Sequence, residues 1–120
     1  MQKRVDITIE NQIAHVRMVR SDKMNALDND MMEAMIAAGE RLKNEAGLRA
    51  IVLSGEGRAF CVGADMKAHG SAKRTLFQRR AYLQLGNDVC EAITKLSKPV
   101  VAAVNGYALG AGAEMAVSCD

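Results

Sequence analysis

Short strand-like apolar runs alternate along this chain with helical patterns, and this order constrains the fold more than any other feature. Apolar and polar residues alternate over 5–10 and again over 14–18, which predicts a β-hairpin. Apolar, β-branched runs at 49–54 and 100–104 are typical of strands buried in a parallel sheet. Strands and helices in repeating order predict an α/β fold, with parallel pairing and helices packed over the sheet.

Three helices are expected between and after these strands. The first follows a polar loop at 20–30, whose Asp and Asn side chains can cap it, and Gly47 is expected to close it. One face of this helix is apolar and is expected in the core: Met31, Met35, Ala38 and Leu42. A second apolar seam over 82–96 and a short helix over about 111–118 complete the pattern.

Composition favours one soluble globular domain. The chain has 120 residues, of which 49% are hydrophobic and 25% are charged. Its net charge of +2, with no dense basic run, does not favour nucleic-acid binding. The longest uncharged stretch, 99–113, is shorter than the roughly 20 residues of a membrane-spanning helix. No apolar signal region or presequence opens the chain, so a cytoplasmic protein is expected.

The cysteines and histidines do not form a metal-binding or disulfide pattern. Cys61, Cys90 and Cys119 are odd in number, widely separated and outside any CxxC motif. His15 and His69 have no companion at ligand spacing, so no metal site is expected. Cys61 precedes a loop of small residues, but its apolar neighbours favour a packing role over a nucleophilic one.

Two glycine-containing loops, each between a buried strand and a helix, are the strongest functional feature of the sequence. They are 58–67 (RAFCVGADMK) and 105–114 (NGYALGAGAE), and the polar stretch 68–75 after the first is expected to be a mobile loop. Small residues let the backbone approach a ligand closely, and unpaired N–H groups at a helix start attract negative charge. The second loop has the spacing GxxxGxG, not the GxGxxG of dinucleotide-binding proteins. Both loops can converge on one oxygen atom.

The sequence resembles the enoyl-CoA hydratase/isomerase family, also called the crotonase family. The matching segments are Asn25-Ala26-Leu27, RAIVLSGEG, AFCVGADMK, KPVVAAVNGYALGAGAE and Ser118-Cys119-Asp120. In this order and spacing they are highly specific. The resemblance implies a crotonase-like spiral of ββα units, incomplete in this chain, with residues 1–120 forming the amino-terminal part of a single domain about twice as long. It also implies a homo-oligomer, either a trimer or a pair of trimers.

The resemblance further implies an acyl-CoA substrate whose thioester oxygen is held by two backbone N–H groups as it becomes an enolate. The matching residues are Ala64 and Ala111, although the family usually has glycine at the second position. Glu114 matches a catalytic glutamate that works with a second glutamate, expected beyond Asp120. The residues matched to substrate binding are Ala26, Val62, Ala64, Asp65, Met66, Lys67 and Ala111, and Arg58 is a further candidate for the CoA phosphates. No cofactor is implied, because coenzyme A is part of the substrate.

The expected reaction is hydration of trans-2-enoyl-CoA to 3-hydroxyacyl-CoA, as in fatty acid metabolism. Alternatives within the family are an isomerase, a decarboxylase and a thioester hydrolase. A non-catalytic acyl-CoA-binding or assembly module is a further alternative if the chain ends at residue 120. Single residues also have plainer interpretations: Asp65 as a helix cap, Glu114 as a first-turn carboxylate favoured by the helix dipole, and Lys67 as part of a solvated face.

Overall fold

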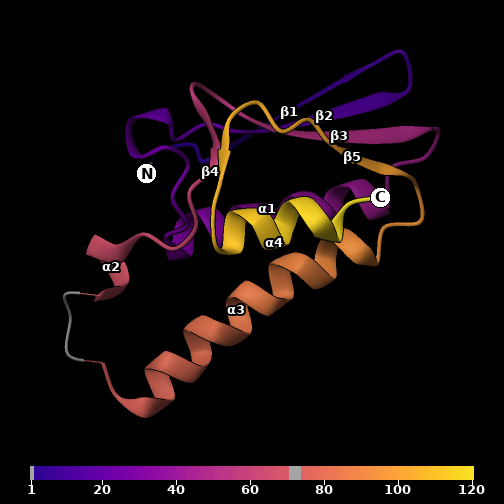
Figure 1. Ribbon diagram of the computed structural model, residues 1–120. Coiled ribbons are helices and arrows are strands. Elements are labelled where there is room, and N and C mark those ends of the chain that lie inside the picture. Colours follow the sequence, from indigo (N-terminus) through magenta and orange to yellow (C-terminus); the bar gives the residue numbers. More distant parts are fainter. Residues whose placement is uncertain (1, 71–73) are drawn as a thin grey trace.

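The computed structural model describes residues 2–70 and 74–120, and in it three helices pack on one side of a sheet (Figure 1). The sheet has the strand order β1-β2-β3-β5. Its strands are β1 (Val5–Glu10), β2 (Ile13–Met18), β3 (Ala50–Gly55) and β5 (Val100–Ala102). β1 and β2 are antiparallel, whereas β2, β3 and β5 run parallel. The predicted α/β fold with a hairpin and parallel strands is therefore confirmed.

A second, two-stranded parallel sheet joins β4 (Ala59–Cys61) to β6 (Tyr107–Ala108). Both strands lie within the predicted loops 58–67 and 105–114, because runs this short show no periodicity. The last predicted strand, 100–104, ends earlier than expected, at Ala102. The β4–β6 pair matters for function because it lies at the base of both glycine-containing loops.

The first helix begins within the polar loop predicted over 20–30, and it ends before the predicted residue. α1 (Asn29–Lys43) follows a short 3-10 turn, η1 (Ser21–Lys23), and Asp28 caps it by accepting a hydrogen bond from the Met31 N–H at 2.8 Å. Its C-cap is Asn44, so the prediction that Gly47 closes the helix is wrong. Gly47 instead has a φ of +84° in the turn that follows, a conformation that glycine adopts without strain.

The remaining helices are α2 (Met66–Gly70), α3 (Leu76–Thr94) and α4 (Ala111–Ser118). The mobile loop predicted over 68–75 is wrong at its start, which is helical, while residues 71–73 lie outside the described residues. Thr75 begins α3 in a capping box with Gln78. α3 packs along α1 and α4, and the helix predicted over 111–118 is confirmed.

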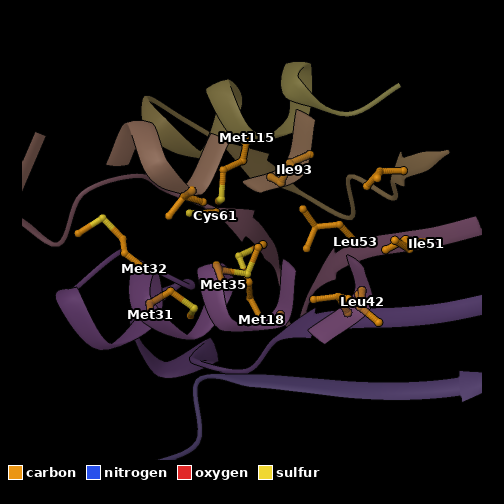
Figure 2. Packing of buried hydrophobic residues seen from close by; sticks show 14 of the residues in the cluster. Met18, Met31, Met32, Met35, Leu42, Ile51, Leu53, Cys61, Ile93 and Met115 are labelled. Atoms are coloured by element: carbon orange, nitrogen blue, oxygen red, sulfur yellow. The ribbon is translucent and has the colours of Figure 1, made fainter. Parts of the chain in front are cut away.

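The core lies between the sheet and the helices and is rich in methionine (Figure 2). The predicted apolar face of α1 is buried in it: Met31, Met35, Ala38 and Leu42. Met18 enters from the sheet, and Met115 from α4. Burial of each such side chain contributes about 1.5–3 kcal/mol. The core thereby fixes α4, and the loop that precedes it, against the sheet.

Candidate active site

Backbone contact between the two glycine-containing loops defines the site. Cys61 of β4 pairs with Ala108 of β6, and the Leu109 N–H donates to the Cys61 oxygen at 3.0 Å. Beyond this pair, a Cβ atom on Gly63 would lie 2.8 Å from the Leu109 oxygen and 3.4 Å from the Ala111 nitrogen. Only glycine permits so close an approach, because Gly63 also has a φ of +94°. The two loops predicted to converge are therefore in direct contact.

The direction of the Ala64 N–H follows from its pairing with Leu27. Leu27 donates to the Gly63 oxygen at 2.8 Å and accepts from the Asp65 N–H at 3.0 Å, which makes a parallel bridge between Leu27 and Ala64. The Gly63 carbonyl and the Ala64 N–H belong to one planar trans peptide, so they point in opposite directions. The Ala64 N–H consequently points away from Leu27, and no acceptor for it is present among the described residues.

Ala111 is the first residue of α4, where backbone N–H groups have no partner within the helix. The preceding residue, Gly110, takes the positive φ of the turn, +54°, and Ala111 is not among the described residues with positive φ. Alanine is therefore compatible with the turn at the position where the family usually has glycine. Within the described part of the chain, nothing accepts from the Ala111 N–H.

Glu114 lies in the first turn of α4, three residues after Ala111. Its side chain is exposed and makes no ion pair with any residue in 2–70 or 74–120. A carboxylate at this end of a helix is favoured by the helix dipole. The geometry leaves the carboxylate available to a ligand near the start of α4.

The residues matched to substrate binding fall into two groups. Ala26, Val62 and Asp65 lie beside Ala64, because segment 24–27 runs along the first loop: the Val62 N–H donates to the Met24 oxygen at 3.3 Å, and Leu27 pairs across Ala64. The other two, Met66 and Lys67, project from the exposed surface of α2. Arg58 is exposed in the turn before β4.

Asp65 is the acidic residue of the first loop. Its Oδ1 accepts from the Lys67 and Ala68 N–H groups at 3.1 and 3.2 Å, which confirms the helix-cap interpretation. Its Oδ2 accepts from Arg20 at 2.8 Å. Burial raises the pKa of the Asp65 carboxyl, but the Arg20 hydrogen bond and the backbone donors outweigh it and hold the pKa below its usual value. Asp65 is therefore ionised at neutral pH.

Cys61 is fully buried between the loops, and its Sγ donates to the Asn25 oxygen at 3.1 Å. Burial raises the pKa of the Cys61 thiol to about 11. The thiol is therefore protonated at neutral pH, in agreement with the packing interpretation. No group of three His, Cys, Asp or Glu side chains suited to a metal ion occurs in residues 2–70 and 74–120. None of the helices described is long and apolar enough to span a bilayer.

The sequence pattern does not single out the polar residues that position the loops. Asn25 and Asn105 hold the β3–β4 connection through side-chain amides, and Arg20 joins two segments through its guanidinium. Arg20 and Asp65 are 45 positions apart, a separation that gives no local pattern. The asparagines did occur in the matching segments, but only as parts of a motif.

Comparisons with solved structures identify the class of fold. Enoyl-CoA hydratase from Mycobacterium smegmatis matches with a TM-score of 0.94 and 29% identity over 99% of this chain and 46% of that one. Enoyl-CoA hydratase from Bacillus anthracis matches with a TM-score of 0.92, 28% identity and coverage of 98% and 46%. These structures have the crotonase fold, and the mixed α/β chain described above corresponds to about half of it.

Sequence comparison identifies the family. The model of the enoyl-CoA hydratase/isomerase family matches residues 8–120, and the chain belongs to this family. (E)-Benzylidenesuccinyl-CoA hydratase from Thauera aromatica is 35% identical over 97% of this chain and 44% of the relative. Short-chain-enoyl-CoA hydratase from Clostridium acetobutylicum is 37% identical, with coverage of 92% and 42%. The chain thus spans less than half the length of these relatives.

Proposed function

We propose that the complete protein adds water to trans-2-enoyl-CoA to form 3-hydroxyacyl-CoA, and that this chain supplies the site that holds the thioester. The contact between the two loops at Gly63 and Ala111 carries the proposal. Relatives named as hydratases of CoA thioesters, among them a short-chain-enoyl-CoA hydratase, support it. Because the chain spans about 44% of such a relative, the activity is proposed for the complete protein.

The N–H groups of Ala64 and Ala111 donate to the thioester oxygen. Negative charge builds on this oxygen as the substrate becomes an enolate, and preoriented donors in a site that excludes water stabilise it better than water does. Removal of one such donor costs about 3–4 kcal/mol in the transition state. The close approach at Gly63 supports a single site for both donors.

Glu114 serves in proton transfer. Water forms a bond from its oxygen to C3 and gives a proton to a carboxylate, while the π electrons of the C2=C3 bond move toward the thioester oxygen. The enolate then takes a proton at C2 as the carbonyl reforms. One carboxylate at the start of α4 supplies half of this acid–base pair. The resemblance implies that the other is a second glutamate beyond Asp120.

The CoA portion lies along Ala26, Val62, Asp65 and α2. Arg58 and Lys67 are the basic residues proposed for its phosphates, because both are exposed at the ends of the first loop. No further cofactor is required, since coenzyme A arrives with the substrate. Assembly into trimers or pairs of trimers, a cytoplasmic location and a role in fatty acid metabolism complete the proposal.

Replacement of Glu114 by Gln in the complete protein tests the acid–base role. Turnover, followed as loss of the conjugated thioester absorbance, is expected to fall by about 10²–10⁴-fold, while CoA affinity stays unchanged. Glu40→Gln, on the exposed surface of α1, is the matched control. Unchanged turnover in Glu114→Gln would exclude Glu114 from the mechanism.

Product analysis with the unmodified protein separates the alternatives. Release of free CoA thiol identifies a thioester hydrolase, a shifted double bond an isomerase, and loss of CO2 from a carboxylated acyl-CoA a decarboxylase. Binding of acyl-CoA without any turnover would replace the enzymatic proposal by a binding module. Hydration by the purified 120-residue chain would show that these residues suffice.

A further inference from the structure

A network of four charged side chains lies behind the first loop. Arg4, Arg20, Asp28 and Asp65 each have only 12–14% of the side chain exposed. Arg4 contacts Asp28 at 2.9 Å, and Arg20 contacts Asp28 at 3.4 Å and Asp65 at 2.8 Å. Two positive and two negative charges balance, as a largely buried network requires. None of the four residues contributes an N–H group to the proposed thioester site.

Arg20 is the member of the network that joins the two segments flanking Ala64. Its Nη1 donates both to the Ala26 oxygen at 3.0 Å and to Asp65 Oδ2 at 2.8 Å. Ala26 immediately precedes Leu27, whose N–H fixes the orientation of the Gly63–Ala64 peptide by donating to the Gly63 oxygen. Asp65 immediately follows Ala64. One guanidinium nitrogen therefore holds both sides of the bridge that orients the Ala64 N–H.

Arg20 is itself fixed in place. Its N–H donates to Asn25 Oδ1 at 2.9 Å, and its carbonyl accepts from the Asn25 N–H at 2.9 Å. Nη2 is occupied by Asp28, the residue that caps α1. A planar guanidinium can serve these three acceptors at once, whereas the single ammonium of a lysine cannot match the same geometry.

We infer that Arg20 is a positioning residue, which keeps the Ala64 N–H aimed at the thioester oxygen by clamping Ala26 and Asp65 together. The inference rests on the proposed function. Arg20 acts on the proposed thioester site indirectly, through the backbone of the first loop. Displacement of a donor by a fraction of an ångström weakens its bond to the developing charge, and misplacement of about 1 Å can cost about 10²-fold in rate. Arg20 therefore contributes to kcat without contacting substrate.

The test compares Arg20→Lys with the unmodified complete protein. The readouts are kcat, KM, CoA affinity and the infrared C=O stretch of a bound, carbonyl-labelled enoyl-CoA. In Arg20→Lys we expect kcat to fall by about tenfold to a hundredfold with little change in KM or CoA affinity, because the lost interaction acts in the transition state. The C=O stretch of the bound ligand should return toward its value in water.

Two matched controls separate positioning from stability. Arg4→Lys alters the same network but contacts neither Ala26 nor Asp65, so it should lower the melting temperature without moving the C=O stretch. Arg17→Lys changes an exposed pair with Glu56 and should alter neither. Asp65→Asn, which keeps the α2 cap, provides the same spectroscopic test if Arg20→Lys does not fold.

The outcomes distinguish this inference from the proposed function. If the unmodified protein neither shifts the C=O stretch of the bound ligand nor turns it over, the proposed function fails. If it does both, and Arg20→Lys or Asp65→Asn retains the shift and kcat, the positioning role of Arg20 is overturned. Equal effects of Arg4→Lys and Arg20→Lys on the C=O stretch would also overturn it, since they would indicate general loosening of the network.

Discussion

Asn25 and Asn105 donate to the same carbonyl oxygen: their Nδ2 atoms lie 3.0 and 3.2 Å from the oxygen of Ala59. The Oδ1 atom of each residue accepts from a backbone N–H, that of Arg20 for Asn25 and that of Gly55 for Asn105. These side-chain amides supply hydrogen bonds to the backbone between β3 and β4, where strand pairing is interrupted. The start of the first loop is therefore held by side chains from two distant segments.

Asn25→Asp is expected to destabilise the complete protein strongly. The Asn25 side chain is fully buried, and Nδ2 also lies 3.1 Å from the oxygens of both Glu56 and Phe60. The oxygen that replaces Nδ2 would face three carbonyl oxygens with no donor, and a buried polar group without its partner costs about 1–3 kcal/mol, more for a charged group. Urea unfolding measures the loss.

Asn11→Asp is the matched control for this change. Asn11 has a similar left-handed conformation, with φ of +52° against +58° for Asn25, but it is exposed in the β1–β2 turn. Its substitution should change the free energy of unfolding little. Equal effects at the two positions would contradict a special role for the buried amide.

Gly63→Ala is expected to reduce turnover more than it reduces stability. A Cβ at this position would lie 2.8 Å from the Leu109 oxygen, so the two loops must separate. Separation moves the N–H groups of Ala64 and Ala111 apart, and loss of one oxyanion donor costs about 10²–10³-fold in kcat. Steady-state kinetics and thermal unfolding of the complete protein measure the two effects.

Gly47→Ala isolates the backbone cost of this substitution. Gly47 has a φ of +84°, close to the +94° of Gly63, but a Cβ there meets nothing within 4 Å. The variant should lose about 1 kcal/mol of stability and keep its kcat. An unchanged kcat in Gly63→Ala would show that the loop contact is not needed for catalysis.

The fold was predictable where the pattern is local. The hairpin and the buried face of α1 follow from periodicity. The capping residue Asp28 lies in the polar loop whose Asp and Asn side chains are expected to cap α1, although the pattern does not single it out. β4 and β6 were missed because strands of three and two residues have no period, and their pairing joins segments far apart in sequence. The predicted end of α1 is too late, because glycine is a common residue just after a helix, whereas Asn44 caps this one.

The candidate site was predictable only through the family resemblance, which supplied Ala64, Ala111 and Glu114. The contacts that orient these residues are tertiary. Arg20 reaches Asp65 across 45 positions, and the contact between the loops depends on Gly63 meeting the backbone near Leu109. No spacing rule connects such residues, because folding alone brings them together.

Asp28→Asn is expected to make the free energy of unfolding depend less on pH in the acid range. Burial raises the pKa of the Asp28 carboxyl, but the Arg4 hydrogen bond, the Met31 N–H and the charge of Arg20 outweigh it, so the folded pKa is lowered. A carboxyl whose pKa is lowered by folding stabilises the folded state above its pKa in the unfolded chain, about 3.9. This stabilisation is lost as the pH falls toward its pKa in the folded protein. Asparagine caps a helix as well as aspartate does.

The measurement is the free energy of unfolding of the complete protein at about pH 7 and about pH 3. Asp28→Asn should be less stable than the unmodified protein at the higher pH, and the difference should shrink at the lower pH. Asp30→Asn, in the first turn of the same helix, removes a carboxylate that forms no ion pair with a described residue, and serves as control. A difference that is constant with pH would contradict the role of the Arg4 and Arg20 pairs.

Gly112→Ala and Gly86→Ala are expected to have opposite effects, although both residues lie within helices. A Cβ on Gly112 would lie 2.0 Å from the Cys61 oxygen, so α4 must move away from β4 and carry Ala111 with it. A Cβ on Gly86 in α3 meets nothing within 4 Å. Alanine there should therefore raise the free energy of unfolding by about 0.8–1 kcal/mol, because its helix propensity is higher than that of glycine. Thermal unfolding should therefore show a lower midpoint for Gly112→Ala and a higher one for Gly86→Ala, with turnover lost only in the former. If Gly112→Ala were as active as the unmodified protein, close packing of α4 against Cys61 would not be what sets the position of the second N–H group.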